Sequence, residues 1–190
     1  MLHWLHYYRA RLQLALRRPD GAIAAYGDAL AANPRFALAA AGIGYLEATR
    51  RHWESSAKAF RQSLDIEPEN ADIWFNLGYV HQQQENDLEA IRCFERAVGL
   101  KRSLDRAWFG LGLIHRRRGE NDRAVKAFKT AADLQPMNPY AWQELAMAQL
   151  ALGNVQEVRR IISHLSGFDP QMTRLLIRDT GQHPEDVKLQ

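Results

Sequence analysis

Apolar residues recur at helical spacing in short segments that polar or glycine-containing breaks separate. The clearest stripe consists of Trp108, Leu111, Gly112 and His115, at positions i, i+3, i+4 and i+7. After a polar break at 118–121, a second stripe consists of Ala124, Ala127, Phe128 and Ala131. Gly119 in the break suits the left-handed conformation that ends a helix, and Pro136 blocks continuation of the second helix. The pattern predicts two antiparallel helices joined by a tight turn.

The same pair of stripes recurs along most of the chain, at the constant spacing in sequence that separates Trp74 from Trp108. The series are Trp74, Trp108 and Trp142; Leu77, Leu111 and Leu145; Gly78, Gly112 and Ala146; Ala90, Ala124 and Val158; and Tyr26, Phe60, Phe94, Phe128 and Ile162. The units end at Pro34, Pro68, Pro136 and Pro170, with Arg102 in the remaining slot. One hairpin cannot bury its own apolar face, so the period predicts hairpins that stack on their neighbours.

These residues resemble the tetratricopeptide repeat family, whose pattern is W-x₂-L-G, then A-x₃-F, then a closing proline. The resemblance covers nearly the whole chain and implies an all-α, right-handed superhelical solenoid. We expect a solenoid at 1–180 with five helix-turn-helix hairpins, at about 3–34, 37–68, 71–102, 105–136 and 139–170. A short capping helix at 173–179 and a disordered tail at 181–190 complete the prediction. The tryptophans, leucines and small residues are expected to be buried between helices.

The first hairpin is the least regular of the five. Its second helix is clear, but Ala22 and Tyr26 have no tryptophan at the usual distance before them. Trp4 precedes Tyr26 by two positions more than Trp74 precedes Phe94. We therefore expect the first helix to start earlier or to pack differently.

Composition excludes several classes of protein. Hydrophobic residues make up 46% of the 190 positions and charged residues 25%, as in an ordinary globular chain. No apolar run approaches the roughly 18 residues of a membrane span, and the N-terminus lacks the apolar core of a signal peptide. Cys93 is the single cysteine, which fits a reducing compartment and favours a cytoplasmic location.

Charge alternates in blocks along the sequence. The net charge is +3, but residues 65–95 carry eight acidic side chains against one arginine, and residues 101–136 carry nine basic against four acidic ones. A nucleic-acid reader usually shows a continuous basic stripe, which this alternation lacks. The opposite charges of the third and fourth hairpins, with Leu175–Ile177 at the C-terminal end, suggest a weak homodimer as a further expectation.

Candidate catalytic and metal-binding residues have simpler structural explanations. His81 and His115 occupy the same repeat slot, and periodicity favours packing between helices over a metal pair. Cys93 directly precedes the core residue Phe94 and lies away from the helix start that would lower its pKa, so we expect an inert, partly buried thiol. No phosphate-binding glycine loop and no catalytic triad spacing occurs. The sequence predicts no catalytic residue, no metal site and no cofactor.

A second stripe lies about 100° around the first helices from the tryptophan stripe. In tetratricopeptide arrays the first helices line the concave face, where ligands usually bind. The predicted ligand groove comprises Tyr45, Phe75, Asn76, Tyr79, Gln82, Gln83, Arg106, Phe109, Leu113, Arg116, Tyr140 and Met147. Aromatic rings supply buried area, while amides and arginines satisfy a peptide's polar groups. The alternative is that the stripe packs neighbouring repeats together.

The family's two-carboxylate clamp for chaperone C-termini does not fit this chain. The corresponding residues are Ala41, Tyr45, Asn76, Arg106 and Gly110, of which only Asn76 matches and Arg106 conserves the charge. We therefore expect a non-catalytic scaffold that binds another kind of protein or peptide segment on its concave face. One alternative is a regulatory or substrate-docking array of a larger enzyme. Another is nucleic-acid or polyanion binding through Arg106 and the run Arg116–Arg118.

Overall fold

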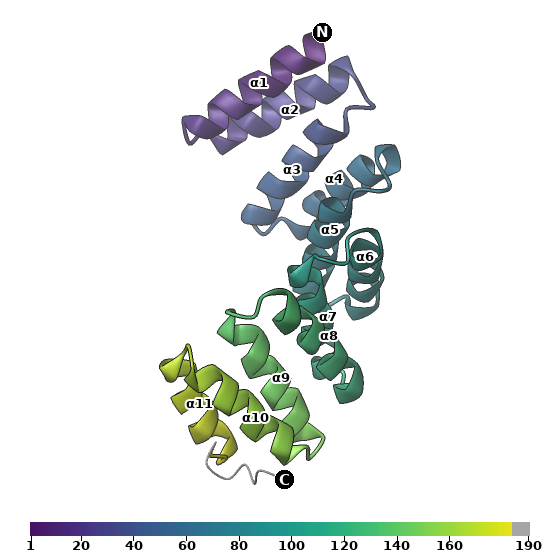
Figure 1. Ribbon diagram of the computed structural model, residues 1–190. Coiled ribbons are helices and arrows are strands. Elements are labelled where there is room, and N and C mark those ends of the chain that lie inside the picture. The colour runs from purple at the N-terminus through teal and green to yellow at the C-terminus, as the bar shows by residue number, and fades with distance from the viewer. Residues whose placement is uncertain (184–190) are drawn as a thin grey trace. The chain divides into compact units, whose positions relative to one another are not determined.

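The computed structural model describes residues 1–183, and all regular structure in that range is helical (Figure 1). The helices are α1 (Leu2–Ala15), α2 (Pro19–Ala32), α3 (Ala37–Thr49), α4 (Trp53–Ile66), α5 (Ala71–Gln83), α6 (Asp87–Leu100), α7 (Asp105–Arg117), α8 (Asn121–Leu134), α9 (Pro139–Ala151), α10 (Val155–Ser166) and α11 (Pro170–Thr180). The all-α solenoid predicted from the repeat period is confirmed. The tail predicted at 181–190 lies outside the described residues beyond 183.

The chain forms two compact units, Met1–Lys101 and Arg102–Gln190, hereafter unit 1 and unit 2. In unit 1 the helices pair as α1 with α2, α3 with α4 and α5 with α6, and α2 and α4 pack on the next pair. In unit 2, α7 pairs with α8 and α9 with α10, and α11 packs against both α9 and α10. Each unit is thus a stack of helical hairpins.

The C-terminal helix α11 begins at Pro170, slightly before the start predicted for the capping helix. The Asp169 side chain accepts a hydrogen bond from the Met172 backbone N–H at 2.8 Å, and Pro170 occupies the first helical position. An aspartate cap followed by proline is a strong helix start, because proline's missing N–H costs nothing there. Leu176 is fully buried, so this helix covers the apolar end of unit 2.

Each regular hairpin closes where an aromatic ring of the second helix lies against a glycine of the first. A Cβ added to Gly44 would lie 2.6 Å from the Phe60 ring, and one added to Gly112 would lie 2.5 Å from Phe128. Such distances leave no room for a side chain, so the ring packs directly on the helix backbone. The fifth hairpin has Ala146 in the glycine slot and Ile162 in the phenylalanine slot, both fully buried. In this hairpin a larger residue in the glycine slot accompanies a smaller residue in the phenylalanine slot.

The tryptophans pack at the edge of the core and bond to the connections between hairpins. Trp74, Trp108 and Trp142 remain partly exposed, so the prediction that they are buried was wrong. Each indole N–H donates to a backbone carbonyl in the preceding connection, those of Pro68 (2.8 Å), Arg102 (2.9 Å) and Pro136 (2.9 Å). Reaching that carbonyl holds each ring at the edge of its hairpin. Because the acceptor is a main-chain oxygen, Arg102 can replace proline in the series.

Each first helix is followed by a residue with left-handed backbone conformation, and these residues recur at the repeat spacing. They are Arg17 (φ 55°), Arg51 (φ 61°), Glu85 (φ 60°), Gly119 (φ 73°) and Gly153 (φ 75°). The conformation predicted for Gly119 is confirmed. Three of the five positions carry a side chain that disfavours this conformation, because its Cβ crowds the following carbonyl oxygen. The turn geometry is therefore set by the stack and not by local preference.

The glycine–phenylalanine pair should behave as a coupled unit. We expect Gly112→Ala to lower the free energy of unfolding by about 1–3 kcal/mol, because the new methyl group meets the Phe128 ring. In the double variant Gly112→Ala/Phe128→Ile, which copies the pair Ala146 and Ile162, the loss should be smaller than the sum of the two single losses. Urea unfolding of the four proteins measures this. Additive losses would show that the two positions do not constrain each other.

The left-handed turn positions allow a test in which no side-chain contact changes. We expect Gly119→Ala to lower the free energy of unfolding by about 1–2 kcal/mol, although an added Cβ would have no neighbour within 4 Å. The reverse change, Glu85→Gly, should leave stability unchanged or raise it by up to about 1 kcal/mol, since it relieves the same conformation. Chemical denaturation of both variants checks the sign. A clear loss in Glu85→Gly would mean that its side chain stabilises the turn.

Candidate functional site

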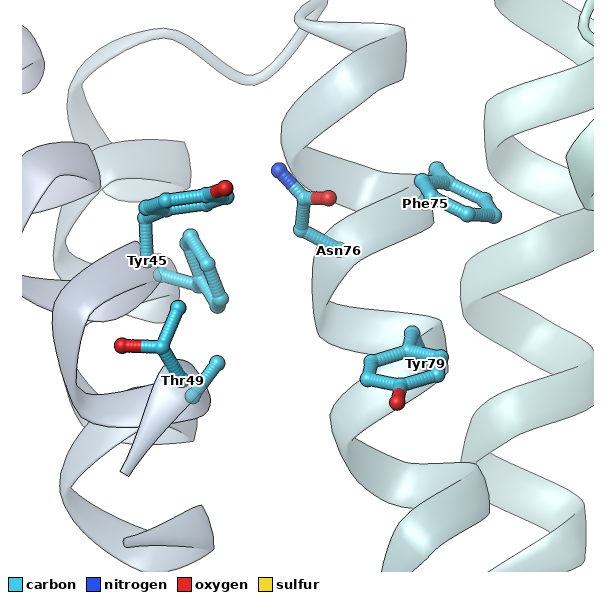
Figure 2. A pocket seen from close by; sticks show the side chains of 7 residues that line it. Tyr45, Thr49, Phe75, Asn76 and Tyr79 are labelled. Atoms are coloured by element: carbon cyan, nitrogen blue, oxygen red, sulfur yellow. The ribbon is translucent and has the colours of Figure 1, made fainter. Parts of the chain in front are cut away.

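A pocket opens in unit 1 between the first helices of its second and third hairpins, α3 and α5 (Figure 2). It has a volume of about 300 Å³ and is lined by Tyr45, Ala48, Thr49, Phe60, Phe75, Asn76 and Tyr79. We call it the aromatic pocket. None of its seven lining side chains is charged at neutral pH. Its polar groups are the phenol, hydroxyl and amide groups of the two tyrosines, Thr49 and Asn76.

Tyr45 and Asn76 face each other across the aromatic pocket, whereas the Thr49 hydroxyl donates to the Leu46 carbonyl of its own helix at 2.7 Å. Figure 2 shows Tyr45 and Thr49 on one helix, and the Asn76 amide reaching toward Tyr45 from the other. Tyr45 is 61% exposed and Tyr79 43% exposed, which are high values for such large side chains. Tyr79 also meets the Trp53 ring edge-on, with 6.4 Å between ring centroids. The pocket therefore offers aromatic surface to a ligand without rearrangement of the core.

Two phenylalanines of the predicted groove serve mainly as hairpin core. Phe75 points away from Asn76 in Figure 2 and lies 5.8 Å from Phe94, measured between ring centroids. In unit 2, Phe109 lies 5.6 Å from Phe128 in the same way. Both rings are only partly exposed. Sequence spacing placed them on the groove stripe but could not show that each ring turns toward its own second helix.

The residues predicted on the first helices of unit 2 form a different kind of surface. Arg116 on α7 pairs with Glu144 on α9, with 3.0 Å between Nη1 and Oε2. Burial raises the pKa of Glu144, and the Arg116 charge opposes that rise. Leu113 and Met147 pack against the core of the unit, while Tyr140 is exposed. An ion pair therefore joins the first helices of unit 2, whereas the aromatic pocket between the first helices of unit 1 has no charged lining residue.

The structure thus brings four of the twelve predicted groove residues together in one pocket. These are Tyr45, Phe75, Asn76 and Tyr79. Gln82 and Gln83 follow on α5 but do not line the pocket, and Arg106 is exposed at the start of α7. The predicted groove did not include the other three lining residues, which are Ala48, Thr49 and the core-series residue Phe60. The sequence does indicate Thr49, because Thr49 at the C-terminal end of α3 occupies the same repeat position as the predicted groove residue Gln83 on α5.

The two histidines that share a repeat slot both have partners within their own units. His81 is buried, and its Nε2 lies 3.1 Å from Nη2 of Arg61. A guanidinium can only donate, so Nε2 accepts and the ring is neutral. Burial and the Arg61 charge lower the pKa of His81, in agreement with this. His115 Nδ1 lies 2.8 Å from Oε2 of Glu120. In residues 1–183 no three His, Cys, Asp or Glu side chains cluster as metal ligands would.

The arginine run at the end of α7 is largely engaged with carboxylates. Arg116 pairs with Glu144, and Nε of Arg118 lies 2.8 Å from Oε1 of Glu120. Arg123 reaches the same carboxylate at 3.2 Å. Hydrogen bonds from Arg118 and His115 lower the pKa of Glu120 to about 2. The cluster is therefore closer to neutral than its sequence suggests.

None of the helices in the described part of the chain is long and apolar enough to cross a membrane.

Comparisons with known proteins agree with the fold of helical hairpins. Tetratricopeptide repeat models match residues 7–66 and 109–157, 52–85, and 71–102. A search of curated proteins finds no match. Solved structures with a similar fold include MamA, at 18% identity over 95% of this chain and 94% of that one, with a TM-score of 0.79.

Two further solved structures show the same fold. YrrB, described as a TPR protein with an unusual peptide-binding site, is 21% identical over 92% of this chain and 90% of its own, with a TM-score of 0.78. Pseudomonas aeruginosa PilF is 20% identical over 93% and 82%, with a TM-score of 0.76. At such identities the likeness concerns the fold alone.

The buried Cys93 gives a simple test of the local chemistry of unit 1. Burial, followed by the Glu89 charge, raises the pKa of the Cys93 thiol to about 12. Since only the thiolate reacts, we expect a disulfide reagent such as DTNB to leave Cys93 unmodified in the native protein at pH 8. Full modification should follow on unfolding in guanidinium chloride. Rapid labelling of the native protein would contradict the buried, protonated thiol.

Together, the regular sequence repeat, the helical hairpins and a family model that matches more than half of the chain lead to one conclusion: the chain belongs to the tetratricopeptide repeat family.

Proposed function

We propose that the chain is a non-catalytic protein-interaction scaffold that binds a segment of a partner protein on its first helices, at the aromatic pocket. The observation that carries the proposal is the pocket between α3 and α5, where two exposed tyrosines flank an asparagine amide. Family membership supports the interaction role, since tetratricopeptide repeats are protein-binding modules. The peptide-binding site described for YrrB belongs to a protein of the same fold.

The lining of the aromatic pocket favours an apolar side chain as its occupant. Its volume of about 300 Å³ is in the range of a small ligand site, and its walls are mostly aromatic. The Asn76 amide offers both a donor and an acceptor, which matches the N–H and C=O of a peptide backbone. We therefore propose an extended or helical peptide segment that places one apolar residue between Tyr45 and Tyr79.

Polyanion binding has less support than peptide binding. Arg116 and Arg118 already pair with Glu144 and Glu120, so a phosphate would have to displace those carboxylates. The aromatic pocket, which supplies the accessible rings, is in unit 1 and has no basic lining residue. Docking of a substrate for a larger enzyme would use the same peptide-binding surface and differs only in what the partner does.

The proposal predicts a loss of affinity without a loss of stability. We expect Tyr45→Ala and Tyr79→Ala each to weaken partner binding by about 1–3 kcal/mol, the usual range for aromatic hot spots. Asn76→Ala should also weaken it, because the peptide group it satisfied would lose its partner. Partners are first captured from a lysate with the wild-type chain and identified by mass spectrometry. The affinity of each purified partner is then measured for every variant by calorimetry.

Controls separate binding from folding. Leu88→Ala changes an equally exposed apolar residue on a second helix and should leave affinity unchanged. Phe75→Ala should lower the melting temperature, because that ring packs on Phe94. If both tyrosine variants keep wild-type affinity, the partner does not use the aromatic pocket. If they melt at lower temperature in proportion to lost affinity, the tyrosines stabilise the fold and the proposal fails.

A further inference from the structure

Helix α1 is apolar on two opposite sides, although only one of them faces the core. Its inner side packs on the core of unit 1 through residues such as Ala10 and Leu14. Its outer side carries Leu5, Tyr8, Leu12 and Leu16, each more than half exposed. We call these four residues the α1 outer face. A helix with apolar residues all round is normally buried in its assembly.

The repeat itself shows what normally covers this face. Leu5 occupies the slot of Ile73 on α5 and Ala141 on α9, and both of these are 9% exposed or less. Leu12 occupies the slot of Val80 and Ala148, which are fully buried. On α1 the same two slots are 65% and 57% exposed. In the other cases the covering element is a second helix, α4 on α5 and α8 on α9. The α1 outer face is therefore the continuation of the interface by which hairpins stack.

The exposed side of α11 in unit 2 is polar, in contrast to the α1 outer face. The exposed positions of α11 include Gln171, Arg174, Arg178 and Asp179. Terminal helices of repeat proteins need such a polar outer face to stay soluble. Helix α1 lacks one, and Figure 1 shows it as the outermost helix of unit 1, with α2 on one side only. The contrast within one molecule indicates that the α1 outer face has an occupant.

Charge identifies the kind of occupant. The segment that precedes Pro19 contains Arg9, Arg11, Arg17 and Arg18 and no aspartate or glutamate. Arg9 pairs with Asp28 of α2, and the remaining three arginines are exposed. A second copy that docked its own α1 on this face would bring two such basic helices together, which like-charge repulsion disfavours. An acidic helix would instead gain from the arginines beside the apolar stripe.

We propose that the α1 outer face docks an amphipathic helix of another protein, whose apolar stripe is flanked by glutamate or aspartate. The docked helix takes the place that a second helix takes on α5 and α9. Leu5 and Leu12 supply the buried contact, and Arg11, Arg17 and Arg18 select the acidic flanks. This surface is separate from the aromatic pocket and does not depend on the function proposed for it.

The test uses a defined probe and the full chain. The probe is a fluorescent helical peptide of five turns with leucine on one face and glutamate elsewhere, and its twin carries lysine in place of glutamate. We expect fluorescence anisotropy to show saturable binding of the glutamate peptide that weakens as salt rises. Leu5→Gln/Leu12→Gln should weaken it by at least about tenfold, the loss of one or two hot-spot contacts. Leu88→Gln and Tyr45→Ala/Tyr79→Ala should bind like wild type.

The double variant should fold normally, because both leucines are exposed, and its melting temperature checks this. Four outcomes would overturn the proposal. The glutamate peptide does not bind, or the lysine peptide binds as tightly. Light scattering shows a dimer that the double variant abolishes, which makes a second copy the occupant. Anionic phosphatidylserine vesicles bind the wild type but not the double variant, while the peptide binds neither, which makes a lipid surface the occupant.

Discussion

The packing of one aromatic ring on a bare stretch of helix backbone sets the geometry of every regular hairpin. Where Gly44, Gly78 or Gly112 leaves the first helix without a side chain, a phenylalanine of the second helix fills the space. Because the contact is closely packed, even a single methyl group added to the glycine would overlap the ring. The two helices are therefore fixed in separation, and the next hairpin stacks on a surface of defined shape. Ala146 with Ile162 shows that the constraint lies in their combined volume.

That contact also decides which residues remain available for function. The ring of the second helix occupies one stripe of the first helix, and the preceding hairpin covers another. The positions between these stripes stay open, and in unit 1 they carry Tyr45, Asn76 and Tyr79. Tyr45 and Tyr79 remain 61% and 43% exposed there, although Tyr79 also contacts the Trp53 ring. Phe75 lies between the pocket and the hairpin core, because it lines the pocket while its ring packs on Phe94.

The outer faces of α1 and α11 follow from the same stacking rule. A hairpin buries its apolar surface only when neighbours cover both of its sides. In the described residues α1 packs on α2, and α11 packs on α9 and α10. The exposed side of α11 carries arginines and Gln171, so it presents polar groups to solvent. Helix α1 presents leucines and Tyr8 there, so the stacking interface continues to its surface. The two units also differ in their first helices, which are joined in unit 2 by the ion pair of Arg116 and Glu144.

The sequence by itself determined the helical hairpins, their period and the burial of the leucines and small residues between helices, because these are repeated local patterns. It also placed Tyr45, Asn76 and Tyr79 on one stripe. Only the tertiary structure decided how far each side chain reaches. It turned Phe75 and Phe109 toward their own hairpins, held the tryptophans at the hairpin edges by bonds to backbone carbonyls, and forced Arg17, Arg51 and Glu85 into left-handed turns. Periodicity specifies the face of the helix on which a residue lies, whereas the direction, burial and partners of its side chain depend on the helices packed around it.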